Sequence, residues 1–284
     1  MLFKSLFVAA ATAVGVSGHV AREAPRTFGC GTHEPSAEHV GMSKVLAAQE
    51  ARVLESGNLT ARATINVNVY FHVVAASQTV ANGYLTDKMV ADQIAVLNQD
   101  FAPHDVAFRL AGTDRTVNTG WARDSNEIAM KRALRKGTYK DLNLYTQVTL
   151  TDDALGYAYF PTSGATSGST TFIRDGVSIK AQTVPGGTQA GFNLGKTGTH
   201  EVGHWLGLYH TFQGGCTGSG DQVSDTPAQA SFSSGCPIGR DSCPGQAGLD
   251  PIHNYMDYSD DSCYEEFTPG QDARIHSFWT TYRA

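Results

Sequence analysis

The sequence lacks long hydrophobic runs and clusters of basic residues. Beyond the N-terminal region no stretch approaches the ~20 apolar residues that a helix needs to cross a bilayer, so we expect no membrane partner. Lysine and arginine number 21 against 27 acidic residues, which gives a net charge of -6, and they form no run. Because nucleic acids bind basic surfaces, we expect no nucleic-acid partner either.

The N-terminus reads MLFKSLFVAAATAVGVSG. It has one early lysine, an apolar stretch over residues 6–16 and small residues up to Gly18. This pattern is typical of a secretory signal peptide, and the apolar stretch is too short to span a bilayer. We therefore predict a signal peptide over residues 1–18 and a secreted, extracellular protein.

Cysteine is scarce, and secretion makes the five cysteines available for disulfides. One stands alone and four lie close together in sequence: Cys30, then Cys216, Cys236, Cys243 and Cys263. Four cysteines allow three pairings, and the sequence alone does not choose among them. The only N-x-S/T sequon makes Asn58 a candidate N-glycosylation site.

Residues 19–62 are polar and contain one predicted helix, with Ser43 as its N-cap and Leu54 near its end. This segment could not form a hydrophobic core alone. We interpret it as a candidate pro-segment, or a leader, that packs on the domain that follows, residues 63–284.

The domain over residues 63–284 begins with alternating strand and helix patterns. The hydrophobic periodicity predicts strands from Ile65, from Val106 and over 141–148, with helices over 86–101 and 125–137 between them. Residues beyond 155 are predicted to be irregular, apart from a strand over 176–181, a helix from near Lys196 and a final helix capped by Thr268. This order predicts an α+β fold, a mixed α/β sheet with helices packed on it.

Three of the 10 histidines lie within residues 200–210, in the segment THEVGHWLGLYH. Its pattern is H-E-x-x-H-x-x-G-x-x-H. In a helix, residues four apart lie on one face with Cβ atoms ~5–6 Å apart, so His200 and His204 can direct their rings at one point. Two imidazole nitrogens so placed suit Zn²⁺, which binds histidine at ~2.0–2.1 Å. Glu201 lies beside them and can hydrogen-bond a water molecule at the metal.

A third ligand requires the helix to end. A continued helix would carry His210 round the cylinder and away from the metal. Gly207 can adopt a positive φ, which ends the helix and turns the chain back. The pattern therefore predicts a zinc ion held by His200, His204 and His210, with a position open for water as in catalytic sites.

With this extended motif the chain resembles the metzincin clan of zinc endopeptidases, in which a turn containing methionine follows. The segment HNYMDYSDD supplies that turn and places Met256 below the metal. The segments GCTGSGDQVSDTPAQ and NYMDYSDDSC are similar to the pappalysin family, including its ulilysin-like and fungal secreted members. The resemblance implies a metzincin-like fold with two subdomains. The first, residues 63–207, has a twisted mixed sheet and the zinc helix, and the second, residues 208–284, is irregular, clamped by disulfides and ends in a helix.

The same resemblance implies hydrolysis of peptide bonds in protein or peptide substrates. Zinc polarises the scissile carbonyl and acidifies its water, Glu201 acts as general base, and Tyr258 stabilises the oxyanion. A packed loop tyrosine is the alternative for Tyr258. The implied disulfides are Cys216–Cys243 and Cys236–Cys263.

Two accessory features carry weaker signals. Asp221, Asp225 and Thr226 are candidate calcium ligands by resemblance, and acids that cap turns in a loop are the alternative. Cys30, in FGCGT, resembles a cysteine switch that occupies the open zinc position and keeps the enzyme latent. The alternative is a free or intermolecular thiol. A switch requires activation by cleavage near residues 60–64.

Two other classes of protein compete with the enzyme. A catalytically silent zinc-binding or inhibitory protein would not need Glu201, and a structural zinc module would offer four ligands instead of three histidines. We expect a monomer. The other histidines are predicted to be structural: His72 is packed in a strand, and five lie at the surface, namely His33, His39, His104, His253 and His276.

Overall fold

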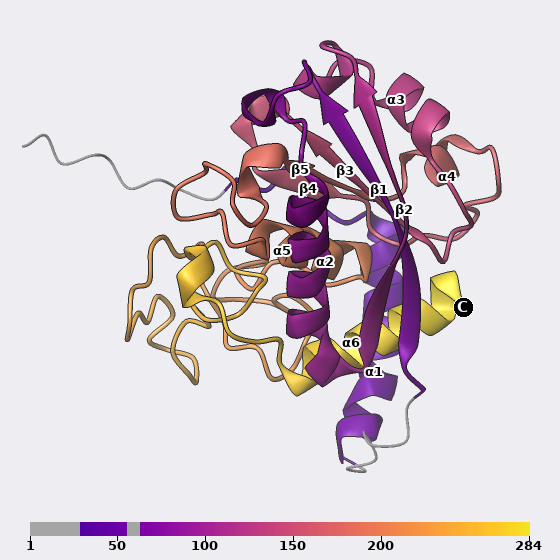
Figure 1. Ribbon diagram of the computed structural model, residues 1–284. Coiled ribbons are helices and arrows are strands. Elements are labelled where there is room, and N and C mark those ends of the chain that lie inside the picture. Colours follow the sequence, from indigo (N-terminus) through magenta and orange to yellow (C-terminus); the bar gives the residue numbers. More distant parts are fainter. Residues whose placement is uncertain (1–28, 56–62) are drawn as a thin grey trace, which may run out of the picture.

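The computed structural model describes residues 29–55 and 63–284 (Figure 1). The predicted signal peptide and Asn58 lie outside these residues. The helices are α1 (Ala37–Glu55), α2 (Asp87–Phe101), α3 (Glu127–Leu134), α4 (Thr170–Arg174), α5 (Lys196–Trp205) and α6 (Pro269–Phe278). The strands are β1 (Ile65–Ala75), β2 (Val106–Val117), β3 (Leu142–Gln147), β4 (Gly156–Ala158) and β5 (Val177–Lys180). Among the described residues, no helix has the length and apolar character needed to cross a membrane.

The strands form one mixed sheet in the order β2-β1-β3-β5-β4. Four strands are parallel, and β4 is antiparallel to β5 at the edge. Parallel neighbours require crossover connections, which the helices between the first strands provide. The predicted α+β fold with a mixed sheet is therefore confirmed.

The side chains of β1 alternate between the two faces of the sheet, and different helices cover each face. Val67, Val69, Phe71 and Val73 point to one side and pack in the main core with α2 and α5. On the other face, Val74 packs with residues near α3 in a second cluster. Helices on both faces bury the strands, and α5 lies beneath β4 and β5.

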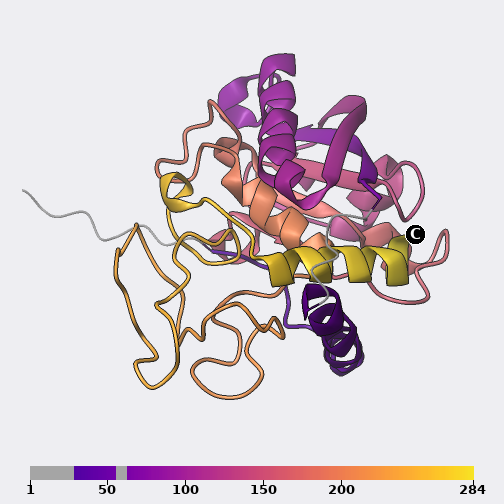
Figure 2. The same ribbon diagram turned by 90° about the horizontal axis from the view of Figure 1, so that it is seen from below.

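Helix α6 closes the chain and lies between α5 and α1 (Figure 2). Thr268 caps it in a capping box with Gln271, and Pro269 is its first residue, as the sequence predicted. A short π-helix, Trp279–Arg283, continues it.

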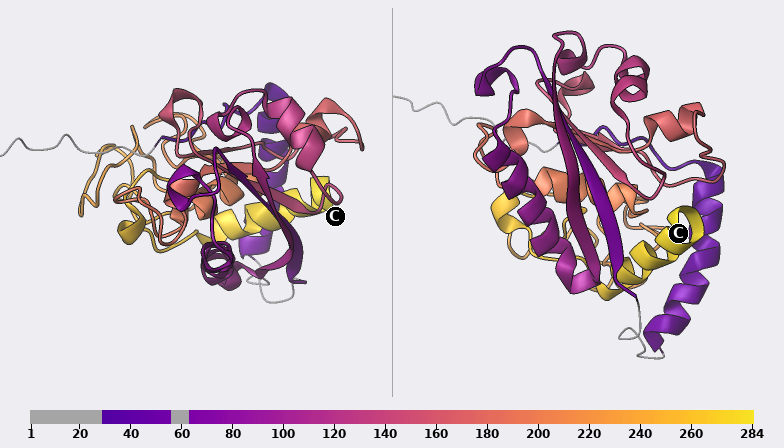
Figure 3. Two further views of the ribbon diagram at one scale, coloured as in Figure 1. Left: turned by 45° about the horizontal axis from the view of Figure 1, so that its top comes forward. Right: turned by 45° about the vertical axis from the view of Figure 1, so that its right-hand side comes forward.

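The part of the chain between α5 and α6 is almost entirely loop and gathers at the opposite end of the molecule from α3 and α4 (Figures 1 and 3). Two disulfides clamp it, Cys216–Cys243 and Cys236–Cys263, which are the pairs implied by the resemblance. In each disulfide the two cysteines are 27 positions apart in the sequence. The two bonds therefore constrain a region that has little regular hydrogen-bonded structure.

Several predicted boundaries were wrong. Helix α1 begins at Ala37 instead of after Ser43, which is buried inside it and donates a hydrogen bond to the carbonyl of His39. Helix α3 starts after Asn126, whose side chain caps it, and ends well before Gly137. The short elements β4 and α4 were missed because they lie in a glycine-rich stretch without clear periodicity.

Candidate metal centre

Helix α5 carries the first two histidines of the motif, and nearly all of its residues are buried. It begins at the left-handed Gly195, and the carboxylate of Asp261 accepts a hydrogen bond from the backbone N–H of Leu194 at 2.7 Å. His200 and His204 project from the same face of this helix. Their Nε2 atoms lie 3.1 Å apart.

His210 completes the cluster. Its Nε2 atom lies 3.0 Å from that of His204, so three imidazole nitrogens converge on one point. Burial lowers the pKa of all three histidines, to about 4 for His204, and neutral imidazoles have lone pairs available for a metal. Three neutral nitrogen donors in one buried place fit a divalent metal ion.

The outer nitrogens of two of these histidines are held by backbone carbonyls. The Nδ1–H of His204 donates to the carbonyl of Leu208 at 2.7 Å, and that of His200 donates to the carbonyl of Tyr255 at 2.7 Å. These bonds set the tautomer so that each Nε2 faces the common point.

The turn at Gly207 has the predicted geometry. Helix α5 ends at Trp205, and Gly207 has a φ of +102°, which is strained for any residue with a Cβ atom. The backbone N–H of Leu208 bonds back to the carbonyl of Gly203 at 3.0 Å. A Cβ atom on Gly207 would lie 2.5 Å from Cδ1 of Phe278, so the site requires glycine for space as well as for conformation.

Met256 is fully buried. Its sulfur packs so closely on Gly203 of α5 that a Cβ atom there would come within 2.5 Å of it. The segment around Met256 is therefore in direct contact with the helix that carries His200 and His204.

Glu201 is buried beside the histidines. Its Oε2 accepts a hydrogen bond from the hydroxyl of Thr32 at 3.0 Å and one from the thiol of Cys30 at 3.5 Å. Its Oε1 makes no hydrogen bond within the described part of the chain. Burial raises the pKa of Glu201 to about 8, and the bonds from Cys30 and Thr32 offset part of this rise.

Cys30 lies at the centre itself. Its sulfur and one nitrogen each of His200, His204 and His210 all lie within 4.8 Å of one another. The chain around it runs parallel to the edge strand β4, with the N–H of Gly31 donating to the carbonyl of Gly156 at 2.8 Å. The segment before α1 is thus added to the sheet edge directly over the three histidines.

Tyr258 reaches the same point from the segment that follows Met256. Its hydroxyl lies 3.2 Å from Nε2 of His210, and burial raises its pKa. The ring packs against Phe212 and Phe232, with ring centroids 4.9 and 5.3 Å away. The structure therefore brings the predicted site residues His200, His204, His210, Glu201, Tyr258, Met256 and Cys30 into one place.

Comparison with known proteins identifies this arrangement. A family model described as Pregnancy-associated plasma protein-A, peptidase family M43, matches residues 126–279. The chain belongs to this family. It is 98% identical to an extracellular metalloprotease of Verticillium alfalfae over 284 residues, all of both chains. It is 64% identical to an extracellular metalloprotease of Colletotrichum graminicola over 258 residues, 91% of each chain.

Solved M43-like structures agree with this assignment. Mature mirolysin of Tannerella forsythia in complex with a cleaved peptide has a TM-score of 0.62 and 30% identity, over 76% of this chain and 91% of that one. A promirolysin variant from the same organism has a TM-score of 0.66 and 28% identity, over 89% and 94%. The chain is therefore a metalloendopeptidase of the M43 family with a metzincin fold.

The predicted calcium residues of this M43 chain lie in the loop after α5. A cavity of about 200 Å³ is lined by Asp221 and Thr226, among others. The carboxylate of Asp221 and the hydroxyl of Thr226 are buried there side by side, and the hydroxyl donates a hydrogen bond to the carboxylate. Asp225 points elsewhere: its carboxylate accepts bonds from the Thr268 hydroxyl and the Gly270 N–H at 2.8 Å each, at the start of α6.

One contributor to the M43 site and one buried histidine were missed in the sequence. Thr32 lies two residues after Cys30, and nothing in its surroundings indicated that it would bond to Glu201. His39 was predicted at the surface and is buried instead, with its Nδ1 2.6 Å from the hydroxyl of Tyr209. No local pattern identifies such residues, because their partners are about 170 positions away in the chain.

Proposed function

We propose that this metalloendopeptidase is a secreted zinc enzyme that hydrolyses peptide bonds in proteins, with Glu201 as general base. The observation that carries this proposal is the convergence of the Nε2 atoms of His200, His204 and His210, beside a buried carboxylate. Three neutral nitrogen ligands and a neighbouring carboxylate are the donor set of a catalytic zinc site. The relatives are named extracellular metalloproteases, which supports secretion of this chain.

His200, His204 and His210 would hold the metal, which when bound supplies Lewis-acid chemistry by polarising a carbonyl and acidifying water. Glu201 takes a proton at its carboxylate from the attacking water and passes it to the leaving amine. The hydroxyl of Tyr258 donates a hydrogen bond to the developing oxyanion.

We also propose that residues 19–62 are a pro-segment and that Cys30 keeps the full chain latent. In support, the thiol lies with the three histidine nitrogens, and Thr32 and Cys30 both bond to Glu201. The segment thus engages the general base as well as the metal position. Cleavage near residues 60–64, before β1, would release it.

The loop after α5 is our candidate calcium site, with Asp221 and Thr226 as ligands. Their oxygen atoms are buried in the lining of one polar cavity, which supports it. Asp225 would contribute negative charge nearby while its carboxylate caps α6.

The test of the proposed function is casein hydrolysis by the processed enzyme, with and without a zinc chelator. We expect the chelator to abolish activity and zinc to restore it. The variant Glu201→Ala should lose activity by at least about 10²-fold, since general acid–base catalysis contributes ~10²–10⁴-fold. Glu265→Ala, at an exposed glutamate, is the matched control and should retain activity.

Two outcomes would overturn the proposal. Hydrolysis that survives metal removal would exclude the metal site, and full activity of Glu201→Ala would exclude its role as base. A chain that binds zinc but never hydrolyses casein or peptides would favour the silent zinc-binding alternative.

A further inference from the structure

The outer nitrogens of His200 and His204 are held by different parts of the chain. His204 bonds to the carbonyl of Leu208, only four residues away. His200 bonds to the carbonyl of Tyr255, which is 55 residues away. The direction of the His200 ring therefore depends on where the Tyr255 segment sits relative to α5.

The side chain of Tyr255 is anchored to a third element. Its hydroxyl donates a hydrogen bond to Oδ1 of Asp100 at 3.1 Å. Asp100 is on α2, which lies beside α5 (Figure 1), and it is only 4% exposed. The residue whose carbonyl holds His200 is thus tied to α2 through its own side chain.

Asp100 also holds α5 directly. Its Oδ2 accepts a hydrogen bond from the hydroxyl of Thr199 at 2.6 Å, and its Oδ1 accepts one from Nζ of Lys196 at 2.5 Å. Thr199 immediately precedes His200. One buried carboxylate therefore binds both the helical turn that carries His200 and the segment that orients its ring.

The charge of Asp100 is balanced where it lies. Lys196 pairs with the carboxylate and its Nζ also lies 5.4 Å from the ring centre of Tyr255. A buried, paired carboxylate with three donors is held in one place, because moving it would leave a desolvated charge unsatisfied. Such a rigid group can fix the geometry of the groups that donate to it.

We propose that Asp100 is a positioning residue of the metal centre, which acts through Tyr255 and Thr199 to aim Nε2 of His200 at the metal. This inference rests on the proposed zinc site. Groups that orient a metal-ligating histidine typically change metal affinity by about 10- to 100-fold when they are mutated. A purely structural role would change the stability of the fold and leave the affinity of the folded protein unaltered.

The test compares zinc dissociation constants of the full chain, measured by competition with a chromophoric chelator at a temperature where every variant is folded. We expect Asp100→Asn to weaken zinc binding by about 10- to 100-fold, and Tyr255→Phe to weaken it by a smaller factor above about 3-fold, because only one link is lost. Asp141→Asn is the matched control: Asp141 is also buried and accepts bonds from Asn68 and Thr138, at the start of β3.

The inference would be overturned if the zinc dissociation constants of Asp100→Asn and Tyr255→Phe both lay within about 2-fold of the value for Asp141→Asn. If Asp100→Asn does not fold, Tyr255→Phe decides, since it removes only a hydroxyl. Failure of the wild-type chain to take up zinc would instead contradict the proposed function, so the two failures are distinguishable.

Discussion

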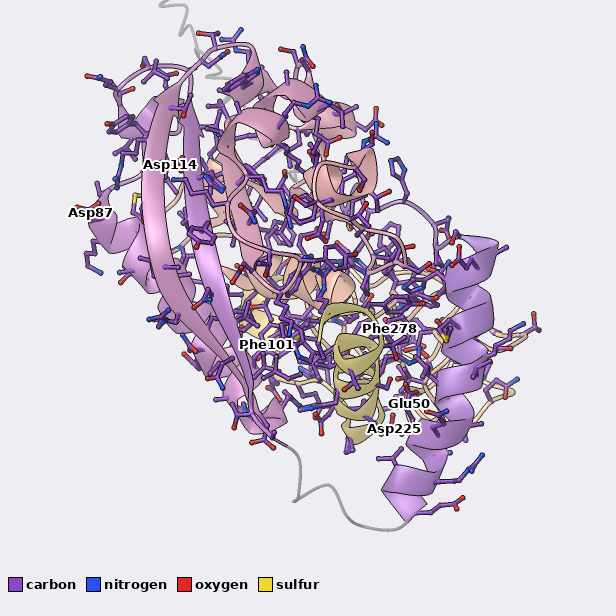
Figure 4. The ribbon with its side chains drawn as sticks, turned by 90° about the vertical axis from the view of Figure 1, so that its right-hand side faces the viewer. Glu50, Asp87, Phe101, Asp114, Asp225 and Phe278 are labelled. Carbon is purple, nitrogen blue, oxygen red and sulfur yellow. A yellow bond between two sulfur atoms is a disulfide. The ribbon has the colours of Figure 1, made fainter. Side chains whose placement is uncertain are left out.

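Glu50 on α1 and Arg274 on α6 form a buried ion pair, with the Nε atom of Arg274 2.9 and 3.0 Å from the two carboxylate oxygens. Glu50 points from α1 toward α6 (Figure 4), and the hydroxyl of Ser277 also donates to it. Arg274 donates in addition to the carbonyl of Gln222 at 2.6 Å. Through this pair α1, part of the proposed pro-segment, is joined to α6.

We predict that Glu50→Ala releases α1. The change leaves a buried guanidinium without its counter-charge, which costs about 3–5 kcal/mol. The expected result is faster limited proteolysis of α1 and a lower midpoint of thermal unfolding for the full chain. Arg52→Ala, at an exposed arginine whose Nε donates to the carbonyl of Ala48 within α1, is the control. Equal proteolysis of the two variants would contradict the prediction.

Acidification should loosen α1 through His39. Burial, and to a smaller extent the charge of Arg274, lowers the pKa of His39 to about 4. Between pH 6.5 and 4 the unfolded chain therefore binds more protons at this residue than the folded chain. The contribution of His39 to the free energy of unfolding is therefore largest above pH 6.5. It decreases as the pH falls toward 4, by about 3 kcal/mol at most.

Chemical denaturation of the full chain at pH 7 and pH 5 measures this effect. In His39→Asn, whose amide can still bond to the hydroxyl of Tyr209, the pH dependence should be smaller than in the wild type. An unchanged difference between the two pH values would assign the acid sensitivity to other groups, such as His104.

We predict that Gly207→Ala destabilises the fold and weakens metal binding. The left-handed φ costs a residue with Cβ ~1–2 kcal/mol, and the contact with Phe278 adds ~1–3 kcal/mol of overpacking. The turn would shift, and His210 with it. Gly164→Ala is the matched control, since Gly164 has a φ of +73° but open space around it. Wild-type zinc affinity in Gly207→Ala would refute the role of this turn.

Removal of the Cys30 thiol should activate the uncut full chain. In Cys30→Ser the thiolate that would compete for the metal is absent, so hydrolysis of a peptide substrate should rise well above that of the uncut wild type. His33→Ala, at an exposed residue of the same segment, should stay as latent as the wild type. If the uncut Cys30→Ser chain is as inactive as the uncut wild type, the segment blocks the site by occupying it and does not need the thiol.

Calcium should stabilise the chain through Asp221. A ligand that binds only the folded state at 100 times its dissociation constant adds ~2.7 kcal/mol. Burial raises the pKa of Asp221 to about 7, so this stabilisation should weaken below pH 7, where protons compete with calcium. Asp221→Asn should abolish the calcium-induced shift in the unfolding midpoint, whereas Asp241→Asn, on an exposed loop, should retain it. A shift that persists in Asp221→Asn would exclude this cavity as the calcium site.

Local sequence patterns determined much of this protein. The spacing of His200 and His204 requires only a helix, because residues four apart share one face. Gly207 could be identified as the turn because a positive φ favours glycine, and Thr268 as a cap because the capping box is local. The alternation in β1 likewise indicated its buried face. Each of these inferences depends on residues within a few positions of one another.

Tertiary structure decided the relationships between distant segments. Cys30 lies over the histidines because its segment joins the edge of the sheet at β4, a short strand without a sequence signal. His39 is buried because α1 packs on α6, and Asp100 meets Tyr255 because α2 lies beside α5. Periodicity shows which face of an element is buried but not which element covers it, so these partners appear only when the whole chain is folded.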